Sequence, residues 1–197
     1  NLDHYDYAEQ CFQRIIRLQP NNYDALAGLA RIEVKRKNFG KAAEYVDRAV
    51  KLYPAEPAVF INRAEVLIMM EQYQSAAQDL ISALSVGKNN KEAIESLAAM
   101  SDVQYDAVIG ALNNSIEKAP RNGLFYYIAA QIAMDHNHFA DAEYYLNAIN
   151  ANKLYEYHSI YNDLAKSQYC LGKYTEALGN IDIAIRACDN EPDYFIT

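Results

Sequence analysis

Apolar and small residues recur along the chain at helical spacing, and the pattern repeats roughly every 34 residues. Each occurrence has an aromatic residue, a small residue three positions later and an apolar residue four positions after that, as in Phe39, Ala42 and Val46. The aromatic position is filled by Tyr5, Phe39, Tyr73, Tyr105, Phe139 and Tyr174. Spacings of three, four and seven residues place side chains on one face of a helix. The pattern therefore predicts an array of repeated helices.

A second set of small residues lies upstream of the aromatics and predicts another helix in each unit. Its members are Ala30, Ala64, Ala98, Ala130 and Ala165, and a large apolar residue precedes each of them by four positions. Proline closes three units, at Pro20, Pro54 and Pro120. Small residues let two helices approach closely where they cross, and proline ends a helix. We therefore expect two helices of about a dozen residues in each unit, with the aromatic filling the space beside the alanine.

The fourth unit departs from this pattern. Ala98 lies seven residues before Tyr105, whereas the alanine lies nine residues before the aromatic in the other complete units. Val108 also takes a position that is alanine elsewhere. The turn between the two helices is therefore two residues shorter, and we expect irregular helix stacking at this point.

The whole pattern resembles the tetratricopeptide repeat (TPR) family. Gly172 matches the family's turn glycine, while Leu, Phe, Ile or Tyr replaces the Trp that is typical of the first helix. The resemblance implies an all-α fold, an α-solenoid of antiparallel helix pairs in a right-handed superhelix, with about five to six repeats. We expect a single repeat domain over residues 1–197, as a fragment of a longer protein. Its expected repeats are a partial unit 1–20, then 21–54, 55–88, 89–120, 121–155 and 156–190, with 191–197 beginning a further helix.

The resemblance also implies a binding surface, because the first helix of each TPR unit lines a concave groove that holds a peptide segment of a partner. The side chains expected on this groove are Arg31, Val34, Lys35, Ile61, Glu65, Ile68, Met69, Tyr127, Gln131, Met134, Asn162, Lys166 and Tyr169. Tyrosine supplies contact area at low entropic cost, which suits peptide recognition. Chaperone-binding members of the family clamp a C-terminal carboxylate with Lys, Arg and Asn, and only Asn62 fits that set here. We expect no chaperone carboxylate clamp.

Composition and charge exclude several other classes of function. The net charge of −8 argues against a nucleic-acid partner. No apolar run approaches the roughly 20 residues that span a bilayer, so we expect no membrane insertion. The three cysteines, Cys11, Cys170 and Cys188, do not form a disulfide framework. Free thiols favour the cytoplasm slightly over a bacterial periplasm, and the residues do not decide between the two.

The stretch "MDHNHFADAEYYL" contains the one cluster that suggests chemistry, His136 and His138 with Asp135 and Asp141. His and carboxylate side chains are common metal ligands. In the repeat, however, this stretch corresponds to the turn between two helices, where side chains are exposed and weakly constrained. We expect no metal site and no cofactor. Signature motifs of common enzymes are absent as well, and we expect no catalysis.

The sequence thus predicts a protein–protein interaction scaffold that binds a peptide or partner protein in its groove. The alternative is a structural or self-assembly module, with oligomerisation, of a larger and envelope-associated bacterial protein. One residue does not fit the repeat: Arg63 takes a core position that Leu29, Leu97 and Leu164 hold in other units. We expect it to pair with a carboxylate such as Glu33 or Glu65, or to extend its charged end outward.

Overall fold

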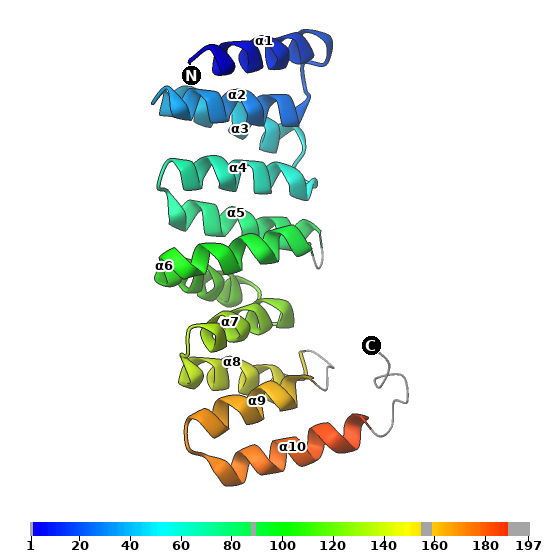
Figure 1. The fold of residues 1–197 in the computed structure, drawn as a ribbon. Helices are drawn as coiled ribbons and strands as arrows, with labels where there is room; N and C mark the ends of the chain where they lie inside the picture. Colours follow the sequence, from blue (N-terminus) through cyan, green and yellow to red (C-terminus); the bar gives the residue numbers. More distant parts are fainter. Residues whose placement is uncertain (1, 88–89, 155–158, 189–197) are drawn as a thin grey trace. The chain divides into compact units, whose positions relative to one another are not determined.

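The computed structural model describes residues 2–87, 90–154 and 159–188 of the chain. Within these residues every regular element is a helix, which confirms the predicted all-α helical-repeat solenoid (Figure 1). The helices are α1 (Leu2–Leu18), α2 (Tyr23–Lys35), α3 (Phe39–Leu52), α4 (Pro57–Met69), α5 (Tyr73–Val86), α6 (Lys91–Lys118), α7 (Gly123–Asp135), α8 (Phe139–Asn152), α9 (Ser159–Cys170) and α10 (Tyr174–Cys188). None of the described helices is long and apolar enough to cross a bilayer. Residues 191–197, where we expected a further helix to begin, lie outside the described residues.

The chain divides into two compact units, Asn1–Ala111 and Leu112–Thr197, and the boundary falls within α6. In the first unit, α2 packs against α3 and α4 against α5, while α4 also contacts both α2 and α3 (Figure 1). In the second unit, α7 packs against α8 and α9 against α10, and α8 also contacts α9. In each of these pairs the two helices are close because the turn that joins them is only a few residues long.

Most of the small residues predicted at the helix crossings are buried in the structure, whereas Ala98 of α6 is only partly buried. Seven of these alanines are at most 2% exposed. On the first helices they are Ala30, Ala64, Ala130 and Ala165, and on the second helices they are Ala42, Ala76 and Ala142. Around Ala30 and Ala42, the side chains of Val34, Val46 and Val66 form one apolar cluster that joins α2, α3 and α4. A methyl group leaves room for the neighbouring backbone, so these positions set how closely the helices approach.

The aromatic residue that marks each unit is less buried than we expected. Phe39 is 46% exposed and Tyr174 is 60% exposed. Each is the first residue of its second helix, directly after the turn. These two rings are therefore only partly covered by their neighbours.

The turns inside the helix pairs share one backbone conformation. Lys37, Glu71, Asn137 and Gly172 hold the same place in their turns, and all four have positive φ values of 63°, 61°, 61° and 76°. In the first of these turns, the amide N–H groups of Lys37 and Asn38 donate to the carbonyl oxygens of Val34 and Glu33, both at 2.8 Å. These bonds satisfy carbonyl groups at the end of α2.

The fourth unit has no such turn, and α6 instead runs through it as one kinked helix. The kink lies at Gln104, which has φ −137° and ψ 54° and directly precedes Tyr105. Asn38 precedes Phe39 in the same way and has φ −88° and ψ 60°. The two residues missing from this unit are therefore those that form the turn elsewhere, while irregular stacking of the helices stays a prediction.

Arg63 is paired, as expected, but with other carboxylates than those we named. Its guanidinium group donates to Asp79 of α5 at 2.6 and 2.7 Å and to Asp47 of α3 at 2.9 Å. Glu33 instead accepts hydrogen bonds from Asn38 and Lys41, and Glu65 pairs with Arg31. Arg63 therefore points toward the second helices on either side of α4, and the expectation of Glu33 or Glu65 was wrong.

Candidate functional site

In the first unit, the first helices α2 and α4 are joined by polar side chains on their shared face. Arg31 of α2 donates to Asn62 of α4 at 3.0 Å and forms an ion pair with Glu65 of the same helix. Asn62 in turn donates to Asp24 at 3.4 Å. The Arg31 and Glu65 side chains remain 39% and 47% exposed, so a molecule lying along this face meets them directly.

The second unit carries an equivalent contact between α7 and α9. Gln131 donates to Asp163 at 2.7 Å. Partial burial raises the pKa of Asp163, against the opposing effects of the Gln131 hydrogen bond, the charge on Lys166 and a hydrogen bond from Tyr127. Several groups from two helices thus converge on one carboxylate.

The two contacts occupy the same positions in the repeat. Arg31 and Gln131 each lie eight residues before the aromatic of their unit, and Asn62 and Asp163 each lie eleven residues before theirs. The residue types differ, but both pairs place a donor on one first helix and an acceptor on the next. In both units, therefore, a side-chain hydrogen bond at the same repeat positions links two consecutive first helices.

The predicted groove residues differ in how far they reach solvent. Val34, Ile61 and Met134 are buried, with exposures of 6%, 4% and 7%, so they offer little surface to a partner. Met69 is partly buried and packs against the cluster that contains Val34. The predicted residues that are exposed or partly exposed are Arg31, Lys35, Glu65, Ile68, Met69, Tyr127, Gln131, Asn162, Lys166 and Tyr169. The polar members thus carry most of the accessible surface.

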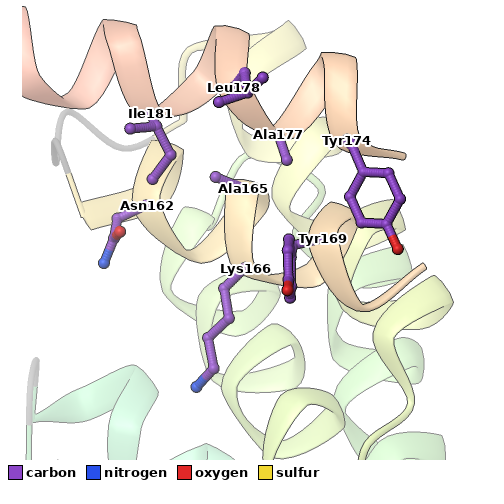
Figure 2. A pocket seen from close by; sticks show the side chains of 8 residues that line it. All are labelled: Asn162, Ala165, Lys166, Tyr169, Tyr174, Ala177, Leu178 and Ile181. Carbon is purple, nitrogen blue, oxygen red and sulfur yellow. The ribbon is translucent and has the colours of Figure 1, made fainter. Parts of the chain in front are cut away.

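A hollow lies between α9 and α10 and has a volume of about 420 Å³ (Figure 2). The residues that line it are Asn162, Ala165, Lys166, Tyr169, Tyr174, Ala177, Leu178 and Ile181. Figure 2 shows Leu178 and Ile181 on the α10 side, with the Tyr169 and Tyr174 rings near one end and Lys166 extending away from α10. The two rings contact edge to face with centroids 5.5 Å apart. We name this apolar surface the α9–α10 groove.

Asn162, Lys166 and Tyr169 were predicted as groove residues, whereas Tyr174 and Ile181 were assigned to helix packing. Leu178 is 66% exposed, although the equivalent residues in two other second helices are Ala43 and Ala77. A signal was present in α10, where Leu178, Ile181, Ile183 and Ile185 are apolar on more than one side of the helix. A helix that is apolar on several sides is normally covered on several sides.

The two histidines lie in the turn between α7 and α8, as the repeat predicts. The Nδ1 atom of His136 is 2.9 Å from the carbonyl oxygen of Ile132, and the Nδ1 atom of His138 is 3.6 Å from an oxygen of Asp141. Across the described residues, no group of three or more His, Cys, Asp or Glu side chains is placed to hold a metal ion.

Comparison with known proteins then decides the family. A family model described as the tetratricopeptide repeat matches residues 1–57 and 127–192, more than half of the chain. The chain belongs to the tetratricopeptide repeat family. TPR proteins are typically scaffolds for protein–protein interaction rather than enzymes, and they bind protein or peptide partners.

Two curated relatives match this TPR chain. Protein CTR9 homolog of Arabidopsis thaliana is 26% identical over 201 residues, which is 97% of this chain and 18% of the relative. Anaphase-promoting complex subunit 3 of Schizosaccharomyces pombe is 31% identical over 75 residues, which is 38% of this chain and 11% of the relative. The chain thus spans less than a fifth of the length of either relative.

Solved TPR-like structures are similar at low identity. The MamA protein is 14% identical with a TM-score of 0.49, covering 89% of this chain and 96% of that one. YrrB, titled a TPR protein with an unusual peptide-binding site, is 16% identical with a TM-score of 0.45, covering 95% of each chain. At these values the similarity does not extend to function.

Proposed function

We propose that this TPR chain is a non-catalytic scaffold that holds extended segments of a partner protein on the exposed face of the first helices within each of its two units. The observation that carries the proposal is the repeated contact between first helices, Arg31 with Asn62 and Gln131 with Asp163. These contacts fix polar side chains in place before a partner arrives. Side chains that are already ordered lose less conformational entropy on binding, which favours affinity.

The chemistry of this face suits the backbone of a peptide. Asn62 and Gln131 carry amide groups that both donate and accept hydrogen bonds, as an extended backbone does. Arg31 and Lys35 add positive charge in the first unit, and Tyr127 adds an aromatic surface in the second. We expect a partner segment with at least one carboxylate near Arg31 and Lys35, because opposite charges across an interface favour the correct alignment.

The curated relatives support a partner protein over a small molecule. Anaphase-promoting complex subunit 3 is, by its name, a component of a larger assembly. The alternative role, a self-assembly module, predicts that the chain alone forms a stable oligomer. Sedimentation of the purified chain measures its oligomeric state and so distinguishes the scaffold from the self-assembly module.

The experiment selects binders from a random peptide library on the purified chain and then measures their affinity by calorimetry. Arg31→Ala combined with Lys35→Ala removes charge from the first-helix face, and Tyr127→Ala removes the aromatic surface. Matched controls are Lys51→Ala and Tyr144→Ala, which change an exposed lysine and an exposed tyrosine on the second helices α3 and α8. We expect a loss of about tenfold in affinity for the first-helix variants, as for residues central to an interface.

The control variants should bind as the unchanged chain does. Equal losses in both sets, or losses only in the controls, would contradict the proposal, since the binding surface would then lie on the second helices.

A further inference from the structure

The start of α2 and the end of α3 carry two tyrosines that the repeat pattern does not require. Tyr23 is the first residue of α2, and Tyr53 directly follows the last residue of α3. In the next repeat Pro57 and Gly87 take these two positions, and a Cβ atom added to Gly87 would lie 2.4 Å from Cγ of Pro57. Two helix ends therefore meet there without aromatic side chains, so the repeat fold does not explain the tyrosine pair.

The two rings are held in place beside a hollow. They contact edge to face, with centroids 5.5 Å apart. Tyr23 also packs against the buried cluster of Leu26, Ala49 and Val59, which fixes its position, while Tyr53 is 36% exposed. The hollow has a volume of about 450 Å³ and lies between the α1–α2 turn and the two tyrosines. The polar residues in its wall are Gln19, Asn21, Asn22 and Asp24.

Two carboxylates lie beside the tyrosine pair. Asp24 directly follows Tyr23 in α2. Glu56 lies next to Tyr53, because its N–H donates to the Tyr53 carbonyl oxygen at 3.1 Å in the turn after α3. The pKa of Tyr23 is raised by partial burial first and then by the charges of Asp24 and Glu56. Negative charge from two different helices therefore acts on one ring.

The partners of these two carboxylates are neutral. Asp24 accepts from the side-chain amide of Asn62 at 3.4 Å, and Glu56 accepts from the N–H of Ala58 at 3.4 Å. In the part of the chain that the structure describes, neither carboxylate belongs to an ion pair. Arg48 contacts the same wall, but it donates to the carbonyl oxygen of Pro20 and to Asn21 instead. Asp24, Glu56 and Arg48 together leave an excess of negative charge at the hollow.

We propose that this hollow, which we name the Tyr23–Tyr53 site, binds the side chain of a lysine or arginine residue of a partner protein. In an edge-to-face pair, the ring that contributes its edge keeps its faces available. A cation over the face of a tyrosine ring is attracted by the ring's electrons, and the carboxylates of Asp24 and Glu56 add charge of the opposite sign. The aliphatic part of the side chain lies along the aromatic surface, as long basic side chains commonly do.

The site is distinct from the first-helix surface proposed above, because its groups lie at helix ends and in the turns after α1 and α3. The two proposals therefore fail separately. Loss of basic-residue binding at the Tyr23–Tyr53 site leaves the Arg31 and Lys35 surface untested, and the peptide-library experiment above does not use the Tyr23–Tyr53 site.

The test compares two short peptides on the 197-residue chain, acetyl-Gly-Lys-Gly-amide and acetyl-Gly-norleucine-Gly-amide. Norleucine has the lysine side chain without its ammonium group, so the pair isolates the charge. Amide NMR spectra recorded during titration report which residues each peptide contacts. We expect the lysine peptide to shift the amides of Asn22 and Tyr53 and to bind at least about fivefold more tightly than the norleucine peptide. Added salt should narrow this difference.

Two variants test the two parts of the site. Tyr53→Leu keeps an apolar side chain but removes one ring, and it should weaken binding of the lysine peptide by about two- to fivefold. Asp24→Asn keeps the size of an exposed side chain but removes its charge, and it should weaken the lysine peptide while leaving the norleucine peptide unchanged.

The matched control is Tyr144→Leu. Tyr144 is 67% exposed and forms another edge-to-face pair with Tyr145, with centroids 5.4 Å apart. The neighbouring carboxylate, Asp141, lies 3.6 Å from the Nδ1 atom of His138, so it already has a basic neighbour. This variant should bind the lysine peptide as the unchanged chain does.

Three outcomes would overturn the proposal. Equal affinity for the two peptides would make the hollow an apolar site. A lysine peptide that shifts neither Asn22 nor Tyr53 would place the contact elsewhere. Unchanged affinity in both Tyr53→Leu and Asp24→Asn would show that neither the rings nor the charge contributes to binding.

Discussion

Arg63 of α4 meets Asp79 of α5 through two hydrogen bonds, from Nε to Oδ2 at 2.6 Å and from Nη2 to Oδ1 at 2.7 Å. Asp79 is 5% exposed, although carboxylates are rarely buried without a partner. Burial raises the pKa of Asp79, and the hydrogen bonds and charge of Arg63 act against that rise. The guanidinium also reaches Asp47, so one side chain connects α3, α4 and α5.

Removing the buried partner should therefore cost the first unit much of its stability. Asp79→Ala leaves the partly buried Arg63 charge with only the exposed Asp47, and breaking a buried pair in this way typically costs about 3 kcal/mol. Urea unfolding followed by circular dichroism measures the change.

Two further variants test whether the pair itself is responsible. Asp47→Ala removes the half-exposed partner and should cost less than about 1 kcal/mol. Arg63→Leu with Asp79→Leu restores the leucine that other units carry and removes both charges, and an apolar replacement of a buried pair is often about neutral. If Asp79→Ala proved no more costly than Asp47→Ala, the buried contact would not contribute.

The sequence predicts well what depends on spacing along one helix. The alanines at the crossings, the turn at His136 and His138, and the missing turn before Tyr105 all follow from the repeat period. The partners of Arg63 do not, because Asp47 and Asp79 lie on second helices whose orientation toward α4 depends on how three helices pack. The burial of Val34 was missed for the same reason: Val66 of the next first helix packs in its cluster, at a position that a single helix leaves open.

The turn residues with positive φ make a second prediction. Lys37 and Glu71 adopt a conformation that disfavours residues with a Cβ atom, and Gly172 fills the same position in the last turn. Changing either residue to glycine should raise the free energy of unfolding by about 0.5–1 kcal/mol, because the relief of strain exceeds the entropy lost. Asn137→Gly should gain less, since asparagine tolerates this region. Thermal unfolding compares the three, and Gly172→Ala should have the opposite sign.

A third prediction follows from the close approach of the start of α7 to the end of α8. A Cβ atom on Gly123 would lie 2.6 Å from the backbone oxygen of Leu154, which cannot move aside as a side chain can. Gly123→Ala should therefore destabilise the second unit by about 1–3 kcal/mol through overpacking.

Gly179 in α10 is the matched control, because no described atom lies within 4 Å of its added Cβ. Gly179→Ala should stabilise by about 0.5–1 kcal/mol through higher helix propensity. A loss of equal size at both positions would show that the contact with Leu154 does not matter.

Glu33 makes the chain's stability depend on pH in a predictable direction. It is 3% exposed, and burial alone would raise its pKa. The hydrogen bonds from Asn38 and Lys41, with the charges of Lys41 and Arg36, outweigh burial, so the pKa of Glu33 is lowered in the folded chain. A lowered folded pKa stabilises the fold above the unfolded value of about 4.3, and this contribution is lost as the pH falls through the folded pKa.

Glu33→Gln should therefore be less stable than the unchanged chain at pH 7, and the difference in the free energy of unfolding should shrink steadily below about pH 4. Urea unfolding at a series of pH values measures it, with the exposed Glu44→Gln as the control that shows no such trend. A difference that stayed constant down to the lowest pH would mean that Glu33 acts through packing and not through its charge.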